Sequence, residues 1–185
     1  MGLGQTMITL GIFILLIMSV ISANRMINEN LQAQLQTQAM ATSATLANDL
    51  LLEILGKKFD SSSDEPLGLI TSPSTSFTAP SSLGPNATEV ANCPQPDSSY
   101  TGAFRSITAY SDVDDYHGYR RIVTANGITG FKLDVVVYYV ASGTPDTKTT
   151  TSATNFKRIQ VTVTHDQFLT TALKNVPVYT ALASY

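Results

Sequence analysis

The fold of this chain is decided by residues 7–23, which read MITLGIFILLIMSVISA. No charged residue interrupts these 17 residues, and that length is the short end of what a helix needs to cross a bilayer. A signal peptide carries a basic segment before its apolar core, whereas the first basic residue here is Arg25. The stretch therefore predicts a helix that is apolar all round and is buried in lipid or among other apolar helices.

The next stretch, residues 24–59, continues the helical pattern without a proline, and its first glycine is Gly56. It is rich in Ala, Leu, Gln and Met, which are good helix formers. Apolar residues recur four positions apart at Ile27, Leu31 and Leu35, which places them on one helix face. We predict one continuous helix over residues 5–56, about 75–80 Å long at 1.5 Å per residue.

The chain as a whole divides into three regions. Residues 1–56 form the helix, of which residues 1–23 are apolar, and residues 57–100 read as a Ser/Thr/Pro-rich loop. Residues 101–185 have the alternating pattern of a β domain. The predicted strands are 104–110, 119–124, 131–141, 157–165 and 176–185.

The strongest β signals are residues 131–141 and 157–165. Every second residue is apolar from Phe131 to Tyr139, and again from Ile159 to Val163. Asn126-Gly127 predicts a tight turn before the first of these strands, and the stretch with Gly143 and Pro145 reads as a loop. The predicted fold class is α+β: a long N-terminal helix whose last third covers one face of an antiparallel sheet.

Composition narrows the function classes. Only 14% of the residues are charged, and the net charge of −3 with scattered basic residues argues against nucleic-acid binding. A single cysteine, Cys93, excludes an intrachain disulfide, and no neighbour in sequence activates its thiol. No nucleophile–histidine pattern or nucleotide-binding loop is visible around His117 or His165, so we expect a protein that is not an enzyme and needs no cofactor.

Two local motifs are weak candidates for modification or metal binding. Asn86-Ala87-Thr88 matches the N-glycosylation sequon, for which chance is the competing explanation. Asp112, Asp114 and Asp115 have a spacing that offers carboxylates to Ca²⁺, but the EF-hand pattern fails beyond them. A solvated turn is the favoured interpretation there, so no metal site is predicted.

The layout resembles the type IV pilin and pseudopilin family. Residues 1–16 read MGLGQTMITLGIFILL, with Leu3 in the position of the family's leucine and Gln5 where its glutamate stands. The C-terminal segments 131–135 and 157–163 also resemble minor pilins and pseudopilins. The sequence departs from the family at Gln5, and at Ser22, where the family has a helix-breaking proline.

The resemblance implies a structural subunit that polymerises through its helix into an extracellular pilus-like filament. The assembly residues it implies lie in the apolar segment: Met1, Leu3, Gln5, Leu10, Phe13, Leu16 and Ile17. In this family the glutamate pairs with a neighbour's terminal amine, and Gln5 accepts a hydrogen bond from that amine without a charge. The resemblance also implies a leader removed before a methylated Met1 and insertion in the inner membrane before assembly.

Several alternatives stay open at this point. The helix also fits a bitopic membrane-anchored surface protein, a minor pseudopilin of a secretion system, or an envelope spike. The residues do not distinguish a major from a minor subunit, nor adhesion from motility, DNA uptake or secretion. The polar helical stretch 24–45 favours the homopolymer, because an anchor has no use for about 30 Å of helix beyond the bilayer.

Overall fold

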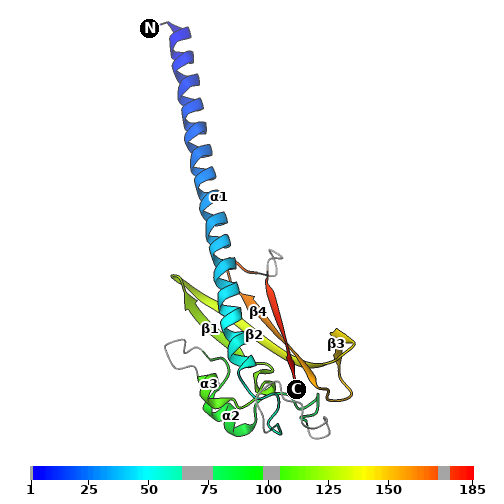
Figure 1. Cartoon of the computed structure of the whole chain (residues 1–185). Coiled ribbons are helices and arrows are strands. Elements are labelled where there is room, and N and C mark those ends of the chain that lie inside the picture. Colours follow the sequence, from blue (N-terminus) through cyan, green and yellow to red (C-terminus); the bar gives the residue numbers. More distant parts are fainter. Residues whose placement is uncertain (1, 64–76, 98–104, 171–175) are drawn as a thin grey trace. The chain divides into compact units, whose positions relative to one another are not determined.

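The computed structural model describes residues 2–63, 77–97, 105–170 and 176–185 (Figure 1). The chain forms two compact units, Met1–Gln38 and Ala39–Tyr185. One helix, α1, runs over Leu3–Leu55 and contributes to both units. This confirms the predicted long helix and the α+β class.

Helix α1 ends where the sequence predicted its end. The Gly56 amide still donates to the Leu52 carbonyl at 3.1 Å, and the Lys57 amide donates to the Ile54 carbonyl at 3.0 Å. The second of these is a three-residue spacing, which tightens the last turn and closes the helix. No residue with a φ above zero or a proline interrupts α1 before this point.

The second unit contains a five-stranded antiparallel sheet. Its neighbours run in the order β1-β2-β4-β5, and β3 pairs with the end of β2. The strands are β1 (Arg120–Ala125), β2 (Ile128–Ala141), β3 (Thr144–Thr149), β4 (Phe156–Thr164) and β5 (Val178–Ser184). Four of the five coincide closely with predicted strands.

Local sequence explains the best-predicted hairpin. Asn126 and Gly127 adopt φ values of 52° and 78°, the left-handed conformation that a two-residue turn between β1 and β2 requires. The turn joins β1 to β2, and β2 also pairs with β4 in a register in which Leu133 faces Val163 and Val135 faces Val161. The alternating apolar residues of both strands therefore point to the same side and are buried.

The core of the second unit lies between this sheet face and the last turns of α1 (Figure 1). From α1 the buried apolar residues are Ala39, Leu46, Ala47, Leu50, Leu51 and Ile54. Together with the buried Thr42 and Ser43, they recur every three or four positions and make one continuous helix face. The predicted covering of the sheet by the last third of the helix is thus confirmed.

Three short helices were not predicted from the sequence. They are α2 (Ala87–Asn92), α3 (Arg105–Ala109) and the 3-10 helix η1 (Asp114–Tyr116). The prediction of unbroken loop over 57–100 is wrong at α2. There Asn86 caps the helix and Glu89 reaches back to the Asn86 amide, which is a reciprocal capping box.

Two further predictions are wrong. A strand is predicted over 104–110, but residues 105–109 form helix α3, in which the buried Ser106 hydroxyl donates to Glu53 and accepts from Arg121. The loop predicted around Gly143 and Pro145 contains β3, an exposed strand that folds back onto the end of β2. Its polar sequence lacks the alternation that marks a half-buried strand.

Candidate functional site

The first unit presents an apolar surface around the whole circumference of α1. No residue of its most apolar 18-residue window is buried within the chain, and the helix is long and apolar enough to cross a membrane. We call the following exposed side chains the apolar surface of α1: Leu3, Met7, Ile8, Leu10, Ile12, Phe13, Ile14, Leu15, Leu16, Ile17, Met18, Val20 and Ile21. Phe13 alone leaves 62% of its area exposed.

Most of the predicted assembly residues lie on this surface. Leu3 is the first residue of α1, and Leu10, Phe13, Leu16 and Ile17 follow within the apolar surface. The Gln5 amide donates to the Gly2 carbonyl at 2.9 Å and so starts the helical hydrogen bonding. Met1 lies outside the described residues.

The two threonines in this region satisfy their hydroxyl groups internally. Thr6 donates to the Leu3 carbonyl at 2.8 Å, and Thr9 donates to the carbonyls of Gln5 and Thr6. A hydroxyl that bonds to its own helix backbone does not need water. These two hydroxyl groups are therefore compatible with burial of this part of α1 in lipid or protein.

Beyond the apolar surface, residues 24–38 are polar and carry one narrow apolar stripe. The stripe consists of Ile27, Leu31 and Leu35, all exposed within the chain and spaced four residues apart. Arg25 and Glu29 form an ion pair of 2.9 Å on the same stretch, with both side chains mostly exposed. This is the pattern of a helix that contacts other helices along one line in the presence of water.

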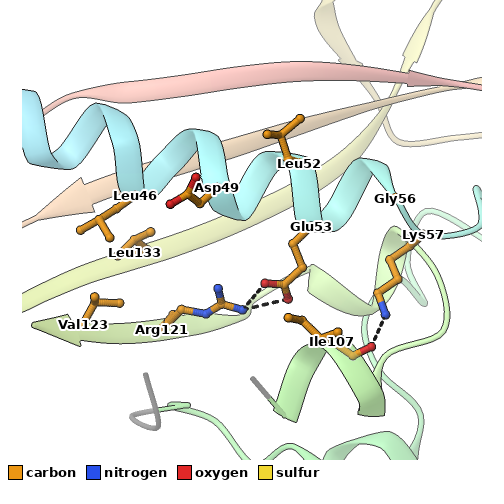
Figure 2. Close-up of a pocket in the computed structure, with 10 residues that line it drawn as sticks. All are labelled: Leu46, Asp49, Leu52, Glu53, Gly56, Lys57, Ile107, Arg121, Val123 and Leu133. Carbon is orange, nitrogen blue, oxygen red and sulfur yellow. Dashed lines mark hydrogen bonds and ion pairs between the residues drawn. The ribbon is translucent and has the colours of Figure 1, made fainter. Parts of the chain in front are cut away.

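The second unit contains a pocket of about 580 Å³ beside the last turns of α1 (Figure 2). Its apolar walls come from α1, α3, β1 and β2, and they include Leu52 and Ile107, which are exposed. Lys57 lies at one end and donates to the carbonyls of Ile107 and Tyr110 at 2.5 and 2.9 Å. Glu53 and Arg121 face each other across the pocket wall.

These two charged residues form a buried ion pair. Arg121 Nη2 donates to both carboxylate oxygens of Glu53, at 2.8 and 2.7 Å. The same carboxylate accepts hydrogen bonds from the hydroxyls of Tyr116 and Ser106, each at 2.7 Å. Arg121 also donates from Nε to the Tyr119 hydroxyl at 2.9 Å. With every strong acceptor occupied, the Glu53 carboxylate is a structural group rather than an available base.

Three tyrosines enclose the polar network. The rings of Tyr110, Tyr116 and Tyr119 lie edge to face with centroids 4.9–5.6 Å apart. Burial is the main cause that raises the pKa of each hydroxyl above its ordinary value. The tyrosines therefore stay neutral and serve as hydrogen-bond donors and packing groups.

A second buried cation, Lys157, lies at the other end of the sheet. Its Nζ contacts Asp114 Oδ1 at 2.7 Å, Asp60 Oδ2 at 3.2 Å and the Phe59 carbonyl at 2.5 Å. Lys157 and the two aspartates are at least nine-tenths buried. Burial by itself raises the pKa of Asp60, but the Lys157 charge and donors from Thr78 and Ser62 lower it overall.

The weak calcium candidates take structural positions around this lysine. Asp112 Oδ1 accepts the backbone amides of Asp114 and Asp115, and Asp115 Oδ2 accepts those of Ser111 and Asp112. Burial, followed by the neighbouring Asp114, raises the pKa of Asp112 to about 9, and burial raises that of Asp115 to about 6. Within the described residues, no group of three or more His, Cys, Asp or Glu side chains is arranged to hold a metal.

The remaining candidate residues have local partners. His117 Nδ1 contacts the Val137 backbone at 2.7 Å, and His165 Nε2 lies 2.9 Å from the Thr129 carbonyl. Cys93 is buried, and burial raises the pKa of its thiol, so it stays unreactive at neutral pH. Asn86 is exposed, and its side-chain oxygen caps α2.

Sequence reasoning missed both buried cations, although a signal was present. The alternation of Ile159, Val161 and Val163 extends backward to Lys157, and Val123 predicts the same inward direction for Arg121. A basic residue at an inward position of a strand requires a buried acid. Comparison with known proteins supplies no further guide to the function of these residues: no protein-family model, curated protein or solved structure matches the chain significantly.

Proposed function

We propose that this chain is a structural subunit that polymerises through the apolar part of α1 into an extracellular filament and is held in a membrane before assembly. The observation that carries the proposal is the apolar surface of α1, which is exposed on all sides and contains no charged residue. We propose no catalytic role for the described part of the chain, where Glu53, Asp114 and both histidines already contact structural partners.

The physical argument starts from the cost of exposing this surface to water. Burying one large aliphatic or aromatic side chain contributes about 1.5–3 kcal/mol. The apolar surface of α1 consists of thirteen such side chains, and the chain itself buries none of them. Lipid before assembly and identical helices afterwards both supply apolar contact, so transfer between the two environments costs little hydrophobic free energy.

The polar part of α1 favours a filament over a simple anchor. Residues 24–38 extend about 20 Å at 1.5 Å per residue and carry the stripe of Ile27, Leu31 and Leu35. A simple anchor gives this ordered apolar stripe no partner in water. Packing of α1 helices from several copies gives the stripe a partner and continues the contact that the apolar surface begins.

A membrane-anchored surface protein is the second candidate function. It is supported by the length and hydropathy of α1, which meet the requirement for one membrane span. In this alternative only the apolar surface is covered, by lipid, and the stripe stays in water. A minor pseudopilin of a secretion system shares the assembly surface and differs in the length of the polymer.

Site-specific crosslinking in the full chain distinguishes these functions. Cys93 is buried, so an engineered exposed cysteine is the dominant reactive thiol. In a polymer, Leu31→Cys on the stripe forms intermolecular crosslinks with a short bifunctional reagent, and electron microscopy of sheared cell material shows filaments. Ala33→Cys is the matched control, since it lies two positions away on a different face of α1. Equal absence of crosslinks at both positions, with no filaments, supports the anchor instead.

A further inference from the structure

The surroundings of Lys157 combine a nucleophile with two carboxyl groups in a dry site. Lys157 has no exposed area, and its Nζ lies 4.4 Å from the Phe59 ring centre and 5.2 Å from that of Tyr139. The carboxyl groups of Asp114 and Asp60 are within hydrogen-bond distance of the same nitrogen. An amine and a carboxyl group held in this way are the two reactants of amide formation.

We propose that Lys157 and Asp114 condense into an intramolecular isopeptide bond between Nζ and the Asp114 side-chain carbonyl carbon, with release of one water molecule. The bond joins β4 to η1 and closes a ring that contains β1, β2 and β3. This modification is independent of polymerisation, because Lys157, Asp114 and the carboxyl groups around them all belong to the second unit.

Positioning of the two reacting groups lowers the barrier to such a reaction. The Nζ–Oδ1 distance of 2.7 Å places the amine in contact with the Asp114 carboxyl group. Well-oriented intramolecular reactants behave as if one were present at roughly 10⁵–10⁸ M. The pairing of β4 with β2 and β5 holds the lysine, and hydrogen bonds from the Asp114 and Asp115 amides to Asp112 hold η1.

Asp60 and Asp114 differ in a way that assigns their roles. Asp60 Oδ2 accepts the Thr78 amide at 2.9 Å, and Oδ1 accepts the amide and hydroxyl of Ser62 at 3.1 and 2.9 Å. These donors stabilise the ionised form, so Asp60 is the poorer electrophile of the two and remains the counter-charge beside the lysine. Asp114 instead lies beside Asp112, whose raised pKa leaves that carboxyl group protonated at neutral pH.

The proton balance closes between Lys157 and Asp114. The Lys157 ammonium transfers one proton to the Asp114 carboxylate, whose Oδ1 it already contacts at 2.7 Å. The neutral amine attacks the Asp114 carbonyl carbon, the C–N bond forms, and one C–O bond breaks. Two of the three ammonium protons leave with that oxygen as water, and Asp60 and Asp112 end in their starting states. No oxidant, reductant or co-reactant takes part.

The low-polarity site also favours the product. Before reaction, the core contains an ammonium group and carboxylates that have lost their hydration, which is costly even when they are paired. The reaction replaces one positive and one negative charge with a neutral amide. An amide needs only hydrogen-bond partners, and the Phe59 carbonyl, 2.5 Å from Nζ, is in place to accept its N–H.

Intact-mass measurement of the folded full-length chain in detergent tests the proposal. The expected result is a mass lower than the unmodified chain by one water molecule, with a branched peptide containing Asp114 and Lys157 after proteolysis. A chain that keeps its full mass after prolonged incubation in the folded state overturns the proposal. This readout does not depend on filaments, so failure of polymerisation and failure of the crosslink are distinguishable.

Variants identify the two residues that form the bond, and the quantity measured is the mass of the chain rather than its stability. Asp114→Asn is expected to lose ammonia instead of water, because the amide nitrogen then becomes the leaving group. Lys157→Arg is expected to keep the full mass. Lys132→Arg is the matched control, since Lys132 forms an exposed ion pair with Asp166 at 2.8 Å and is expected to leave the water loss unchanged. Loss of water in Lys157→Arg places the modification elsewhere and contradicts the assignment.

Discussion

The two units of this molecule distribute apolar and charged side chains in opposite ways. The first unit exposes its apolar residues, with Phe13 and Leu16 each about three-fifths exposed. The second unit buries charged residues, with Lys157 and Arg121 almost inaccessible. Among the described residues, no buried side-chain nitrogen or oxygen lacks a hydrogen-bond partner. The second unit thus satisfies its own buried polar groups, whereas the large apolar side chains of the first unit are not buried by the chain itself.

Helix α1 can run through both units because its backbone hydrogen bonds are formed within the helix itself. A helix satisfies its amide and carbonyl groups whether lipid, protein or water surrounds it. The side chains alone then determine whether a given part of α1 is stable in lipid, in protein or in water. This comparison leads to four tests, in order of expected effect.

The largest effect is expected from breaking the buried ion pair in the second unit. Arg121→Met leaves the Glu53 carboxylate buried without its cation, and we expect a loss of about 3–5 kcal/mol in unfolding free energy. Urea unfolding followed by circular dichroism measures it. Arg120→Met is the control on the same strand, because its ion pair with Asp134 is half exposed and is worth at most about 1 kcal/mol. Equal losses in both variants would contradict the buried role of Arg121.

The next effect concerns the apolar surface of the first unit. Leu16→Lys places a charge in the middle of that surface, at a cost of about 2.5–3.5 kcal/mol for membrane insertion. We expect loss of membrane association and of filaments, with the thermal unfolding of the second unit unchanged. Gln34→Lys, in the polar part of α1, is expected to preserve both. Normal filaments from Leu16→Lys would show that this surface is not buried in the assembly.

A smaller effect is expected from pH. The pKa values of Asp112 and Asp115, about 9 and about 6, are raised above 3.8, so the folded state keeps protons that the unfolded chain releases. Stability is therefore greatest near pH 4 and falls as pH rises from there through these values. Below pH 4 the lowered pKa of Asp60 acts in the opposite sense.

Asp112→Asn tests this assignment. The asparagine oxygen still accepts the amides of Asp114 and Asp115, but the side chain no longer ionises. Urea unfolding between pH 5 and pH 9, on samples matched by intact mass, is expected to give a flatter profile than the parent chain. An unchanged decline above about pH 6 would show that another group is responsible.

The smallest effect is expected at the exposed ion pair of the first unit. Arg25→Ala removes the pair with Glu29, which is worth about 0.3–0.5 kcal/mol at four-residue helical spacing. Helix content by circular dichroism in detergent is expected to stay within error of the parent chain. A clear loss of helix or of filaments would mean that Arg25 contacts another copy rather than Glu29 alone.

The sequence by itself determined the elements whose signal is local. The apolar run of residues 7–23 and the proline-free stretch after it predicted α1, and period-two alternation predicted β2 and β4. Asn126-Gly127 predicted the turn between β1 and β2. Each of these predictions rests on residues a few positions apart, and over that separation helix and strand periodicity can be read directly from the sequence.

The tertiary structure alone decided α3, β3 and the partners of the buried charges. Glu53 and Arg121 are 68 positions apart, and Asp60 and Lys157 are 97 apart, so no local pattern links them. Alternation indicates that Arg121 and Lys157 point inward, but it does not say which acids meet them. That choice follows from the sheet register and from the way the last turns of α1 pack on the sheet, because a buried charge is tolerated only where folding brings its counter-charge within hydrogen-bond distance.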